Sequence, residues 1–511
     1  MMKRIGLVDI GSNTIRLVIF EYSEKTGLIE LQNIKTPARL YQYLDADKEM
    51  AAEGINVLCD TLESFQKVAD KFDVEALYPV ATAAVRQSKN ITEIIDKVVE
   101  RTGIKMRIIS EKEEAYFGYY AVVNTLDYED GVTVDIGGGS TEVTYYEDKE
   151  LKFSHSFPFG VVTLQKLFFN GKAHNDSGAI EEAGKYVKEQ LRSLKWLGKR
   201  KVPIIAIGGS ARNFARIHQS LSEYPIAGVH GYSMSKQDIE YVFKKLITST
   251  MEQLDDLDGL SKDRQDIIVP SGIVFTTLYE EVNATEFIFS RKGLREGITM
   301  SIIEEDYKHP FDKNEVFKES LRNLAYSYNI KHEDALQRRK LAEMLYFELE
   351  KMDLIAGDKQ QKKLMLQAAY LFYLGSYIDS DASSQHTYYI ISNSSLNGIA
   401  HRERVKLALL ASYKSKSLLK FFMDETGWFS DKERGEIQVL GSILKFAHAL
   451  NVSNTRVVTE LYMEQEKEHV NLYIHYSGDP IAEEYQAERQ KKHLEKITKS
   501  KINIIFTENL H

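Results

Sequence analysis

Two short glycine-rich segments, each with an aspartate near its start, are the part of this chain best suited to chemistry. Residues 8–14 read VDIGSNT and residues 134–141 read VDIGGGST, and apolar runs lie on both sides of each. Glycines allow a tight turn that brings backbone N–H groups against an anion, and Ser and Thr hydroxyls add donors. The aspartate can hold a divalent cation or orient a water molecule. We therefore predict two phosphate-binding turns with Asp9 and Asp135 as their acids.

The donors of the two turns are the predicted substrate-binding groups. They are Gly11, Ser12, Asn13 and Thr14 in the first turn and Gly137, Gly138, Gly139 and Ser140 in the second. The copies lie too far apart for a small solenoid repeat, and their spacing suits a duplicated domain. A third glycine turn, at Gly208, Gly209 and Ser210, follows an apolar run and opens a helical pattern, where backbone N–H groups favour anions. A purely structural tight turn is the alternative there.

Two neighbouring glutamates at the start of a predicted helix have different expected roles. Ser110 with Glu113 three residues later has the spacing of a capping box, which gives Glu113 a structural task. Glu114 has no such task. Near the positive end of a helix it should stay ionised, as a general base must be. A solvated glutamate is the alternative, and it is common at helix starts.

Arginines are the expected partners of phosphate oxygens, because the guanidinium fork matches them. Arg86 follows a predicted strand, and Arg295 lies in a basic segment with Arg291 and Lys292. Surface salt bridges are the alternative for each of them. The chain has no P-loop, no Gly-x-Ser-x-Gly nucleophile turn and no Cys/His metal motif.

The residue pattern predicts mixed α/β structure up to about residue 300. Strands are expected at 5–9, 15–22, 76–81, 106–109, 132–136, 142–147, 151–157, 203–207 and 286–289, and helices near 51–72, 91–102 and 111–125. Residues 313–450 have helical spacing throughout. Strands at 457–463, 470–475 and 502–506, with a helix over about 481–499, then predict a small α/β domain.

Composition limits the class of protein. The chain has 511 residues, one cysteine and 8 prolines, with no apolar stretch approaching about 18 residues. We expect a cytoplasmic protein without a disulfide, a membrane span or a signal peptide. The net charge of −9 arises within the first 310 residues, since basic and acidic residues balance beyond them. A nucleic-acid partner is therefore not expected.

The two turns resemble the phosphate motifs of the actin/hsp70/sugar-kinase superfold. More closely, five motifs in order resemble the exopolyphosphatase / guanosine pentaphosphate phosphatase (Ppx/GppA) family. They are residues 9–17, 81–86, 109–115, 135–142 and 293–297. The resemblance implies two actin-like (ribonuclease H-like) lobes at 1–127 and 128–305, an HD-like helical domain at 306–452 and a small α/β domain at 453–511.

The resemblance also implies roles for individual residues. Glu114 corresponds to the family's catalytic glutamate, Arg86 to its phosphate-gripping arginine, and Asp135 and Glu142 to acids that act with Mg²⁺ and water. We expect a homodimeric exopolyphosphatase with Mg²⁺ near Asp9, Asp135 and Glu142 and with inorganic polyphosphate as substrate. The alternatives are a guanosine pentaphosphate phosphohydrolase, a kinase of the same superfold, and a non-enzymatic sensor of polyphosphate or an alarmone.

The helical domain departs from the metal-binding HD pattern. Phe372 and Tyr373 stand where that pattern has His-Asp, His448 stands in place of a later Asp, and a first-helix His is replaced near Lys340. Phe and Tyr cannot replace imidazole and carboxylate as metal ligands. We therefore expect a degenerate HD domain that binds or channels substrate. Its basic clusters (338–340, 362–363, Arg402 and Arg404) are candidates for a polyphosphate track, and solvated helix faces are the alternative.

Overall fold

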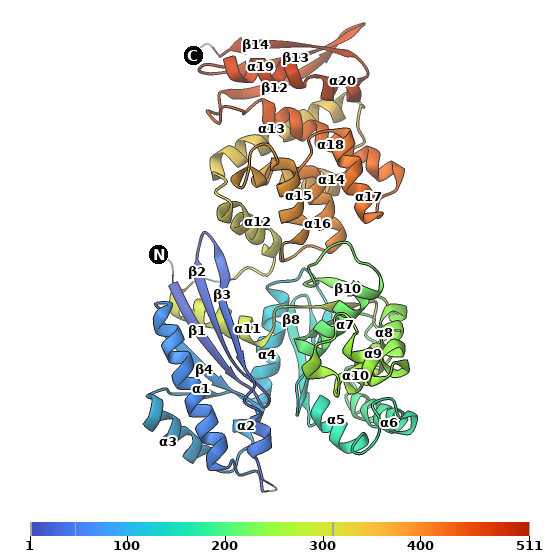
Figure 1. Ribbon diagram of the computed structural model, residues 1–511. Coiled ribbons are helices and arrows are strands. Elements are labelled where there is room, and N and C mark those ends of the chain that lie inside the picture. Colours follow the sequence, from blue (N-terminus) through green and yellow to red (C-terminus); the bar gives the residue numbers. More distant parts are fainter. Residues whose placement is uncertain (1–2, 46, 309–310, 510–511) are drawn as a thin grey trace. The chain divides into compact units, whose positions relative to one another are not determined.

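The contacts in the computed structural model, which describes residues 3–45, 47–308 and 311–509, divide the chain into two compact units (Figure 1). The N-terminal unit holds the described residues up to Tyr224 together with Gly228–Phe317. The C-terminal unit holds Pro225–Ala227 and the described residues from Lys318 onward.

The first lobe of the N-terminal unit, blue in Figure 1, is built on a five-stranded sheet of order β3-β2-β1-β4-β5. The first three strands are antiparallel, and β4 and β5 continue the sheet in parallel. The strands are β1 (Lys3–Ile10), β2 (Ile15–Ser23), β3 (Gly27–Thr36), β4 (Ala76–Ala81) and β5 (Arg107–Ile108). The helices are η1 (Leu40–Tyr43), α1 (Ala52–Lys71), α2 (Ala83–Arg86) and α3 (Ile91–Thr102).

The second lobe repeats this plan with a sheet of order β10-β11-β9-β6-β7-β8. Its first three strands are again antiparallel, and β9 pairs in parallel with β6. The strands are β6 (Gly131–Ile136), β7 (Thr141–Glu147), β8 (Glu150–Phe157), β9 (Ile204–Ile207), β10 (Tyr232–Met234) and β11 (Phe287–Phe289). The helices are α5 (Val161–Phe168), α6 (Ser177–Ser193), α7 (Gly208–Leu221), α8 (Lys236–Thr248), α9 (Met251–Asp255), η2 (Lys262–Arg264) and α10 (Ile268–Val282).

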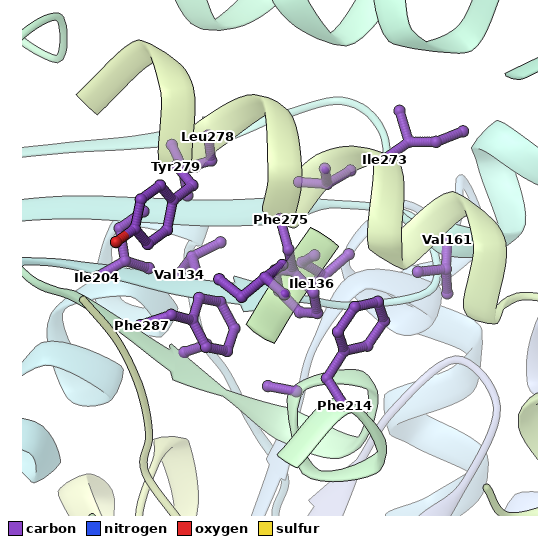
Figure 2. Packing of buried hydrophobic residues seen from close by; sticks show 14 of the residues in the cluster. Val134, Ile136, Val161, Ile204, Phe214, Ile273, Phe275, Leu278, Tyr279 and Phe287 are labelled. Atoms are coloured by element: carbon purple, nitrogen blue, oxygen red, sulfur yellow. The ribbon is translucent and has the colours of Figure 1, made fainter. Parts of the chain in front are cut away.

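The core of the second lobe lies between its central strands and α10. Figure 2 shows Val134 and Ile204 of the sheet near Phe275 and Leu278 of α10, with Phe287 beside them. All five side chains are fully buried. The alternating apolar residues of the strands therefore hold this sheet in place. The second and third glycine turns follow its strands β6 and β9.

Helix α4 (Glu111–Val123) packs on both lobes, together with α11 (Leu294–Tyr307). Phe117 of α4 joins the apolar cluster of the first sheet, whereas Val122 joins a cluster with Ile205 of the second sheet. Gly297 of α11 approaches so closely that a Cβ there would lie 2.0 Å from the Phe117 carbonyl oxygen. This packing fixes the N-terminus of α4, where Glu114 lies.

The strands and helices expected in both lobes are confirmed, but two strands and most helices of the second lobe had not been predicted individually. The sequence did not predict β3 or β10. Most of β3 is only half-buried and its segment is largely polar, since it forms the edge of its sheet. Its residues therefore lack the apolar alternation that identified the other strands. β10 has only three residues and is also an edge strand.

The C-terminal unit is helical and then α/β, as the residue pattern predicts. Its helices are α12 (Val316–Ser327), α13 (His332–Lys351), α14 (Lys359–Tyr370), η3 (Leu374–Tyr377), α15 (Ser383–Asn393), α16 (His401–Ala411), α17 (Lys416–Thr426) and α18 (Asp431–Ala449). A sheet of order β12-β13-β14 follows, formed by β12 (Val458–Gln465), β13 (His469–Tyr476) and β14 (Lys501–Glu508). The helical segment before β14 is divided into α19 (Ile481–Gln490) and α20 (Lys492–Thr498). No helix in the described ranges has both the length and the apolar character needed to cross a bilayer.

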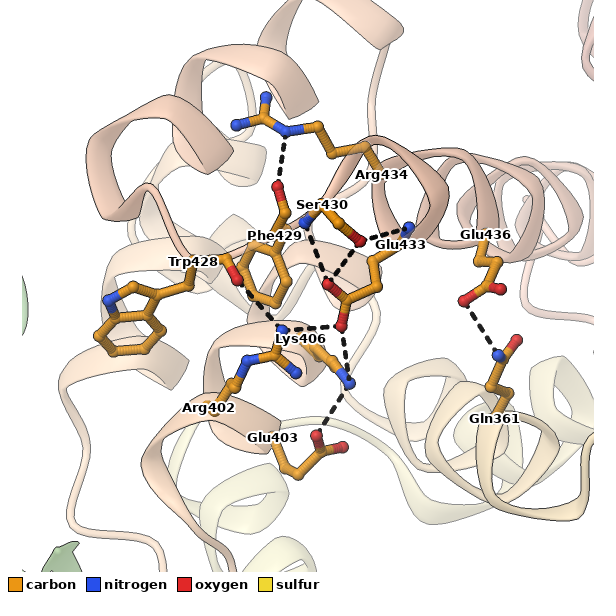
Figure 3. Close-up of polar contacts among 10 residues, drawn as sticks. All are labelled: Gln361, Arg402, Glu403, Lys406, Trp428, Phe429, Ser430, Glu433, Arg434 and Glu436. Carbon is orange, nitrogen blue, oxygen red and sulfur yellow. Dashed lines mark hydrogen bonds and ion pairs between the residues drawn. The ribbon is translucent and has the colours of Figure 1, made fainter. Parts of the chain in front are cut away.

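The start of α18 is held by a capping box centred on Glu433 (Figure 3). Its Oε2 accepts hydrogen bonds from the backbone N–H and the hydroxyl of Ser430, at 3.0 and 2.9 Å. Its Oε1 accepts from Arg402 at 2.7 Å. The Ser430 backbone donor and Arg402 lower the pKa of Glu433 to about 2.

Glu433→Gln should therefore lower the melting temperature of the C-terminal unit at pH 7, and the difference from the unchanged protein should shrink in acid. The stabilisation is fully present above the unfolded pKa of about 4.3 and is lost as the pH falls through about 2. Trp196→Phe would leave Trp428 as the only tryptophan, so its fluorescence can follow the melting of this unit. Glu436→Gln is the control on the same helix, and an equal loss in both variants would refute the capping role.

Candidate active site

The first two glycine turns connect the strands of equivalent hairpins, and each is closed by the same backbone hydrogen bond. Residues 11–14 join β1 to β2, and the Gly11 N–H donates to the Thr14 carbonyl at 3.0 Å. Residues 137–140 join β6 to β7, and the Gly137 N–H donates to the Ser140 carbonyl at 2.9 Å. The duplication read from the sequence is thus present in the backbone of the two predicted phosphate loops.

The register of the strands decides which side chains accompany the two aspartates. Asp9 lies opposite Arg16 on β2, whereas Asp135 lies opposite Glu142 on β7. Glu142 is 5% exposed, and its Oε1 accepts a hydrogen bond from the Ser156 hydroxyl at 2.9 Å. The second lobe therefore places two carboxylates side by side where the first pairs a carboxylate with an arginine.

The start of α4 separates the two neighbouring glutamates as predicted. Glu113 completes the capping box by accepting from the Ser110 backbone N–H at 2.8 Å, and it also pairs with Arg107. Glu114 instead accepts from Arg86 Nη1 at 2.9 Å. Sequence spacing alone thus identified which of the two has a capping task.

Two of the three guanidinium nitrogens of Arg86 donate no hydrogen bond among the described residues. Its Nη1 donates to the Ile109 carbonyl as well as to Glu114, at 2.9 Å each. Its Nε and Nη2 are buried and donate no hydrogen bond among the described residues, while Nη2 forms an ion pair with Glu111 Oε1 at 3.8 Å. Buried donors of this kind are costly unless a ligand or water meets them. Arg86 is therefore prepared to bind an anion beside Glu114.

Four acidic residues lie close enough to raise one another's pKa. They are Asp9, Glu114, Asp135 and Glu142. Burial raises the pKa of Glu114 to about 7 against the opposing effect of Arg86, and Asp135 and Asp9 raise it further. Burial and the Glu114 charge raise the pKa of Glu142 to about 8. Burial and the Asp9 charge raise the pKa of Asp135 to about 6. Burial thus opposes the effect of the helix end on Glu114, which helix-end electrostatics alone did not include.

The third glycine turn lies against Asp135. Strand β9 ends at Ile207 and α7 begins at Gly208, as predicted. Gly208 has a φ of +89°, and a Cβ there would lie 2.6 Å from Asp135 Oδ1. At Gly209 a Cβ would lie 2.3 Å from Arg264 Nη2, and Ser210 accepts from Arg264 Nη1 at 3.2 Å. The turn is thus shaped to admit a carboxylate on one side and a guanidinium on the other.

Further arginines surround Asp9, and most of them were not singled out from the sequence. Arg295 Nε lies 3.9 Å from Asp9 Oδ2, while its buried Nη1 has no hydrogen-bond partner within the described ranges. Burial and the charge of Arg295 lower the pKa of Arg16. Burial and several neighbouring arginines, Arg295 first among them, lower the pKa of Arg212 to about 10. This excess of positive charge favours a polyanionic ligand.

The predicted residues are not all engaged in the same way. Arg291 pairs with Glu30, and Lys292 lies 3.9 Å from Glu296, so only Arg295 of that basic segment contacts a site carboxylate. Arg264, Arg16 and Arg212 were missed as site residues. Arg264 lies in a short 3-10 turn distant in sequence from every glycine motif, and no spacing rule connects it to them.

The carboxylates at the two hairpin turns are of the ligand type that Mg²⁺ prefers, but no three acidic, His or Cys side chains within the described residues are grouped closely enough to hold a metal ion by themselves. Asp9, Asp135 and Glu142 supply hard carboxylate oxygens, and burial raises the pKa of all three. Mg²⁺ is commonly held by one or two carboxylates with waters and substrate phosphates completing its shell. These three residues are the ones that would hold it.

Two lobes that share one strand order, apart from the extra edge strand β10 of the second, and that each carry a phosphate-type hairpin turn define the actin-like class of folds. A sequence model of the Ppx/GppA phosphatase family matches residues 18–306, and a model of domain III of that family matches residues 316–494. The chain belongs to the Ppx/GppA phosphatase family.

Individual relatives agree with this assignment. The bifunctional 3-dehydroquinate synthase/phosphatase of Fusobacterium nucleatum is 27% identical over 308 residues, covering 58% of this chain and 46% of that protein. The crystal structure of the Aquifex aeolicus family member has a TM-score of 0.54 at 24% identity, covering 61% of this chain and 100% of that one. An exopolyphosphatase from Cytophaga hutchinsonii has a TM-score of 0.53 at 22% identity, covering 59% and 98%. At these identities the two structures establish the fold.

The second phosphate loop depends on Gly160, and this can be tested by stability. A Cβ at Gly160 would lie 2.4 Å from the Gly137 carbonyl oxygen, whereas a Cβ at Gly139 would meet nothing within 4 Å. We expect Gly160→Ala to destabilise the protein by about 1–3 kcal/mol, because the backbone of the loop must move. Gly139→Ala should leave the melting temperature nearly unchanged. Equal melting temperatures for both variants would contradict the close approach.

Proposed function

We propose that the protein is an exopolyphosphatase, which removes terminal orthophosphate from inorganic polyphosphate by attack of water. The observation that supports this most directly is the placement of Glu114. Its carboxylate is paired with Arg86 and interacts electrostatically with Asp9, Asp135 and Glu142, in the same unit as both hairpin turns. A base, an anion clamp and a set of acidic ligands thus lie around one place.

In this mechanism the protein mainly positions the terminal phosphoryl group and stabilises its charge. Arg86 uses its free Nε and Nη2 donors, and Arg295 its free Nη1, to hold oxygens of the terminal phosphoryl group. Backbone N–H groups of the two hairpin turns bind the same group. Such preorganised donors stabilise the charge that develops during phosphoryl transfer. Mg²⁺, when bound by Asp9, Asp135 and Glu142, supplies charge neutralisation on the phosphoryl oxygens.

Glu114 acts as the general base. Its pKa of about 7 makes it a better proton acceptor than an exposed glutamate, while a substantial fraction remains ionised at neutral pH. Arg86 holds the Oε2 atom of Glu114, which leaves Oε1 to accept a proton from a water molecule aligned with the scissile bond. Glu113 takes no part, because both of its oxygens are used by Arg107 and Ser110.

Guanosine pentaphosphate is the second candidate substrate. The groups described above contact only a terminal phosphoryl group, which polyphosphate and the guanosine pentaphosphate 5′ end share. The two candidates therefore use the same base and the same arginines and differ in what lies beyond the terminal group.

Glu114→Gln should lose nearly all turnover while retaining polyphosphate binding, since the amide keeps the shape and removes the proton acceptor. General-base catalysis is worth about 10²–10⁴-fold. Glu113→Gln is the matched control, and it should lower helix stability while leaving kcat within a few-fold. The turnover of both variants is measured as orthophosphate release from long polyphosphate with Mg²⁺. A reversed pattern would place the base at Glu113, and a fully active Glu114→Gln would refute the mechanism.

Asp135→Asn should raise the Mg²⁺ concentration needed for half-maximal activity and lower the maximal rate, because a neutral amide oxygen is a poorer ligand for a hard cation. Asp130→Asn provides the control just before the same strand. Asp130 Oδ1 accepts from the Asp148 N–H at 2.9 Å, and an amide oxygen can replace it. An unchanged Mg²⁺ titration in Asp135→Asn would remove Asp135 from the metal site.

A further inference from the structure

The basic clusters expected in the C-terminal unit are largely occupied by internal contacts. Arg402 and Lys362 form ion pairs with glutamates at 2.7 and 3.1 Å. Lys340 donates to a backbone carbonyl at 2.8 Å, and Arg338 and Arg404 are buried. These cationic groups are therefore mostly structural. Unpaired charge of the opposite sign lies in the N-terminal unit.

A pocket of about 570 Å³ lies in the N-terminal unit, along the face of α4 that carries Tyr116, Tyr119 and Tyr120. Its other walls come from α11, from the first residues of β8 and from residues 311–314; α4, α11 and β8 are labelled in Figure 1. The described residues that line it include none of those assigned to the candidate active site. A volume of this size suits a small organic molecule rather than a single ion.

The three tyrosines of α4 form the aromatic wall of the pocket. Their spacing of three and four residues places them on one face of the helix. The Tyr116 ring is stacked on the Tyr120 ring, with centres 5.8 Å apart, and lies 6.0 Å from the Tyr119 ring. Tyr119 Oη donates to the Lys149 carbonyl at 2.9 Å and accepts from the Leu151 N–H at 3.1 Å, which fixes this ring. Faces of tyrosine rings attract cations.

Two carboxylates of the lining have no cationic partner. Glu304 Oε1 accepts from the Phe311 N–H at 3.0 Å, and Asp312 Oδ1 accepts from the backbone N–H two residues later at 2.9 Å. Neither acid forms an ion pair with another described residue. Lys313, a cation of the lining, is instead paired with Glu150. Two negative charges of the pocket are thus left for a ligand to balance.

The Tyr120 hydroxyl lies on the side of the pocket that carries Glu304. Its Oη is buried, and no hydrogen bond joins it to any described residue. Burial and the nearby Glu304 raise the pKa of Tyr120, so the hydroxyl stays protonated and neutral. A buried hydroxyl without a partner is costly unless a ligand or water meets it. Its lone pairs can accept from an N–H group that also meets Glu304.

The pocket extends from solvent into the protein. Tyr116 is 40% exposed and Asp312 is also exposed, whereas Val123 and Asn124 of the same lining are 1% and 7% exposed. The lining therefore has a charged opening and a partly apolar interior. An elongated ligand with separated charges and an apolar stem matches both.

The chemistry of the lining narrows the class of ligand. An anion would be repelled by the two unpaired carboxylates. A bare metal ion is disfavoured, because no three acidic, His or Cys side chains among the described residues are grouped to hold one. A quaternary ammonium would contact the rings but has no N–H for Glu304 or for the Tyr120 hydroxyl. An amine-bearing organic cation satisfies the rings, the carboxylates and the hydroxyl together.

We propose that this pocket binds a linear aliphatic polyamine, with its ammonium groups at Glu304 and Asp312 and its methylene segments against the tyrosine rings. The site stands on these contacts whether or not the proposed hydrolysis is correct.

Spermidine without Mg²⁺ is the probe, and calorimetric titration of the full chain measures its affinity. Glu304→Gln keeps an acceptor for the Phe311 N–H and removes the charge, so it should weaken binding by about tenfold, the effect of losing a charge-assisted hydrogen bond. Glu305→Gln is the matched control, because it removes an exposed charge one residue later on α11, outside the lining, and should leave the affinity unchanged. Asp312→Asn, also isosteric, should weaken binding by a smaller factor and provides a second test where Glu304→Gln disturbs folding.

Two further arms test the rings and the location. Tyr116→Leu should weaken spermidine binding several-fold, whereas Tyr116→Phe, which keeps the ring, should restore most of the affinity. Asp135→Asn should leave the affinity unchanged, because Asp135 belongs to the candidate active site.

The proposal is overturned if spermidine shows no saturable binding, or if Glu304→Gln and Asp312→Asn bind it as tightly as Glu305→Gln does. A loss of affinity in Asp135→Asn in place of Glu304→Gln would assign the amine to the candidate active site and would equally overturn it. Tetramethylammonium binding as tightly as spermidine would contradict the assignment to a polyamine.

Discussion

The burial of four carboxylates together is the constraint on which the N-terminal unit depends. Removing ionised groups from water is costly unless cations and hydrogen-bond donors replace the lost hydration. Arg86 donates a hydrogen bond to Glu114 and Ser156 donates one to Glu142. Arg295 lies 3.9 Å from Asp9. Burial nevertheless raises the pKa of all four acids. The cationic groups around these acids are therefore part of what allows the carboxylates to be buried.

The fold meets this constraint by placing one helix against both lobes. Helix α4 has apolar contacts with both sheets, so its N-terminus is fixed between the strand ends that carry Asp9 and Asp135. The capping box of Ser110 and Glu113 then determines how the first turn begins, and Glu114 follows one residue later. Gly208 leaves room for the Asp135 carboxylate, where any side chain would collide with it. Small local features of the sequence thus set the positions of the acids.

Much of this was predictable from the sequence because it rests on local rules. The hairpin turns, the capping box and the alternating apolar strands are defined by neighbouring residues, and each was found at its predicted place. Arg264, Arg16 and Arg212 were missed because their approach to the acids is created by strand pairing and by a short turn with no motif of its own. The edge strand β3 was missed because its half-buried residues lack apolar alternation. The pKa of Glu114 depends on how deeply α4 packs, which helix-end electrostatics alone do not show.

The C-terminal unit illustrates how poorly charge clusters in sequence predict charge in space. Of the consecutive basic residues 338–340, Arg338 is buried and Lys340 donates to the Thr459 carbonyl of β12. Lys445, which stands in no basic cluster of the sequence, donates to Tyr373 Oη. Helix packing decides which of these cationic groups is used within the unit, and sequence neighbours do not show it.

The central claim, that this chain hydrolyses polyphosphate at the two-lobed site, is tested most directly by comparing its two candidate substrates. Orthophosphate release should be measured side by side from long-chain polyphosphate and from guanosine pentaphosphate, with Mg²⁺ and the same enzyme preparation. The account predicts a higher kcat/KM for polyphosphate, with both activities lost in Glu114→Gln. Efficient hydrolysis of guanosine pentaphosphate together with negligible release from polyphosphate would contradict it.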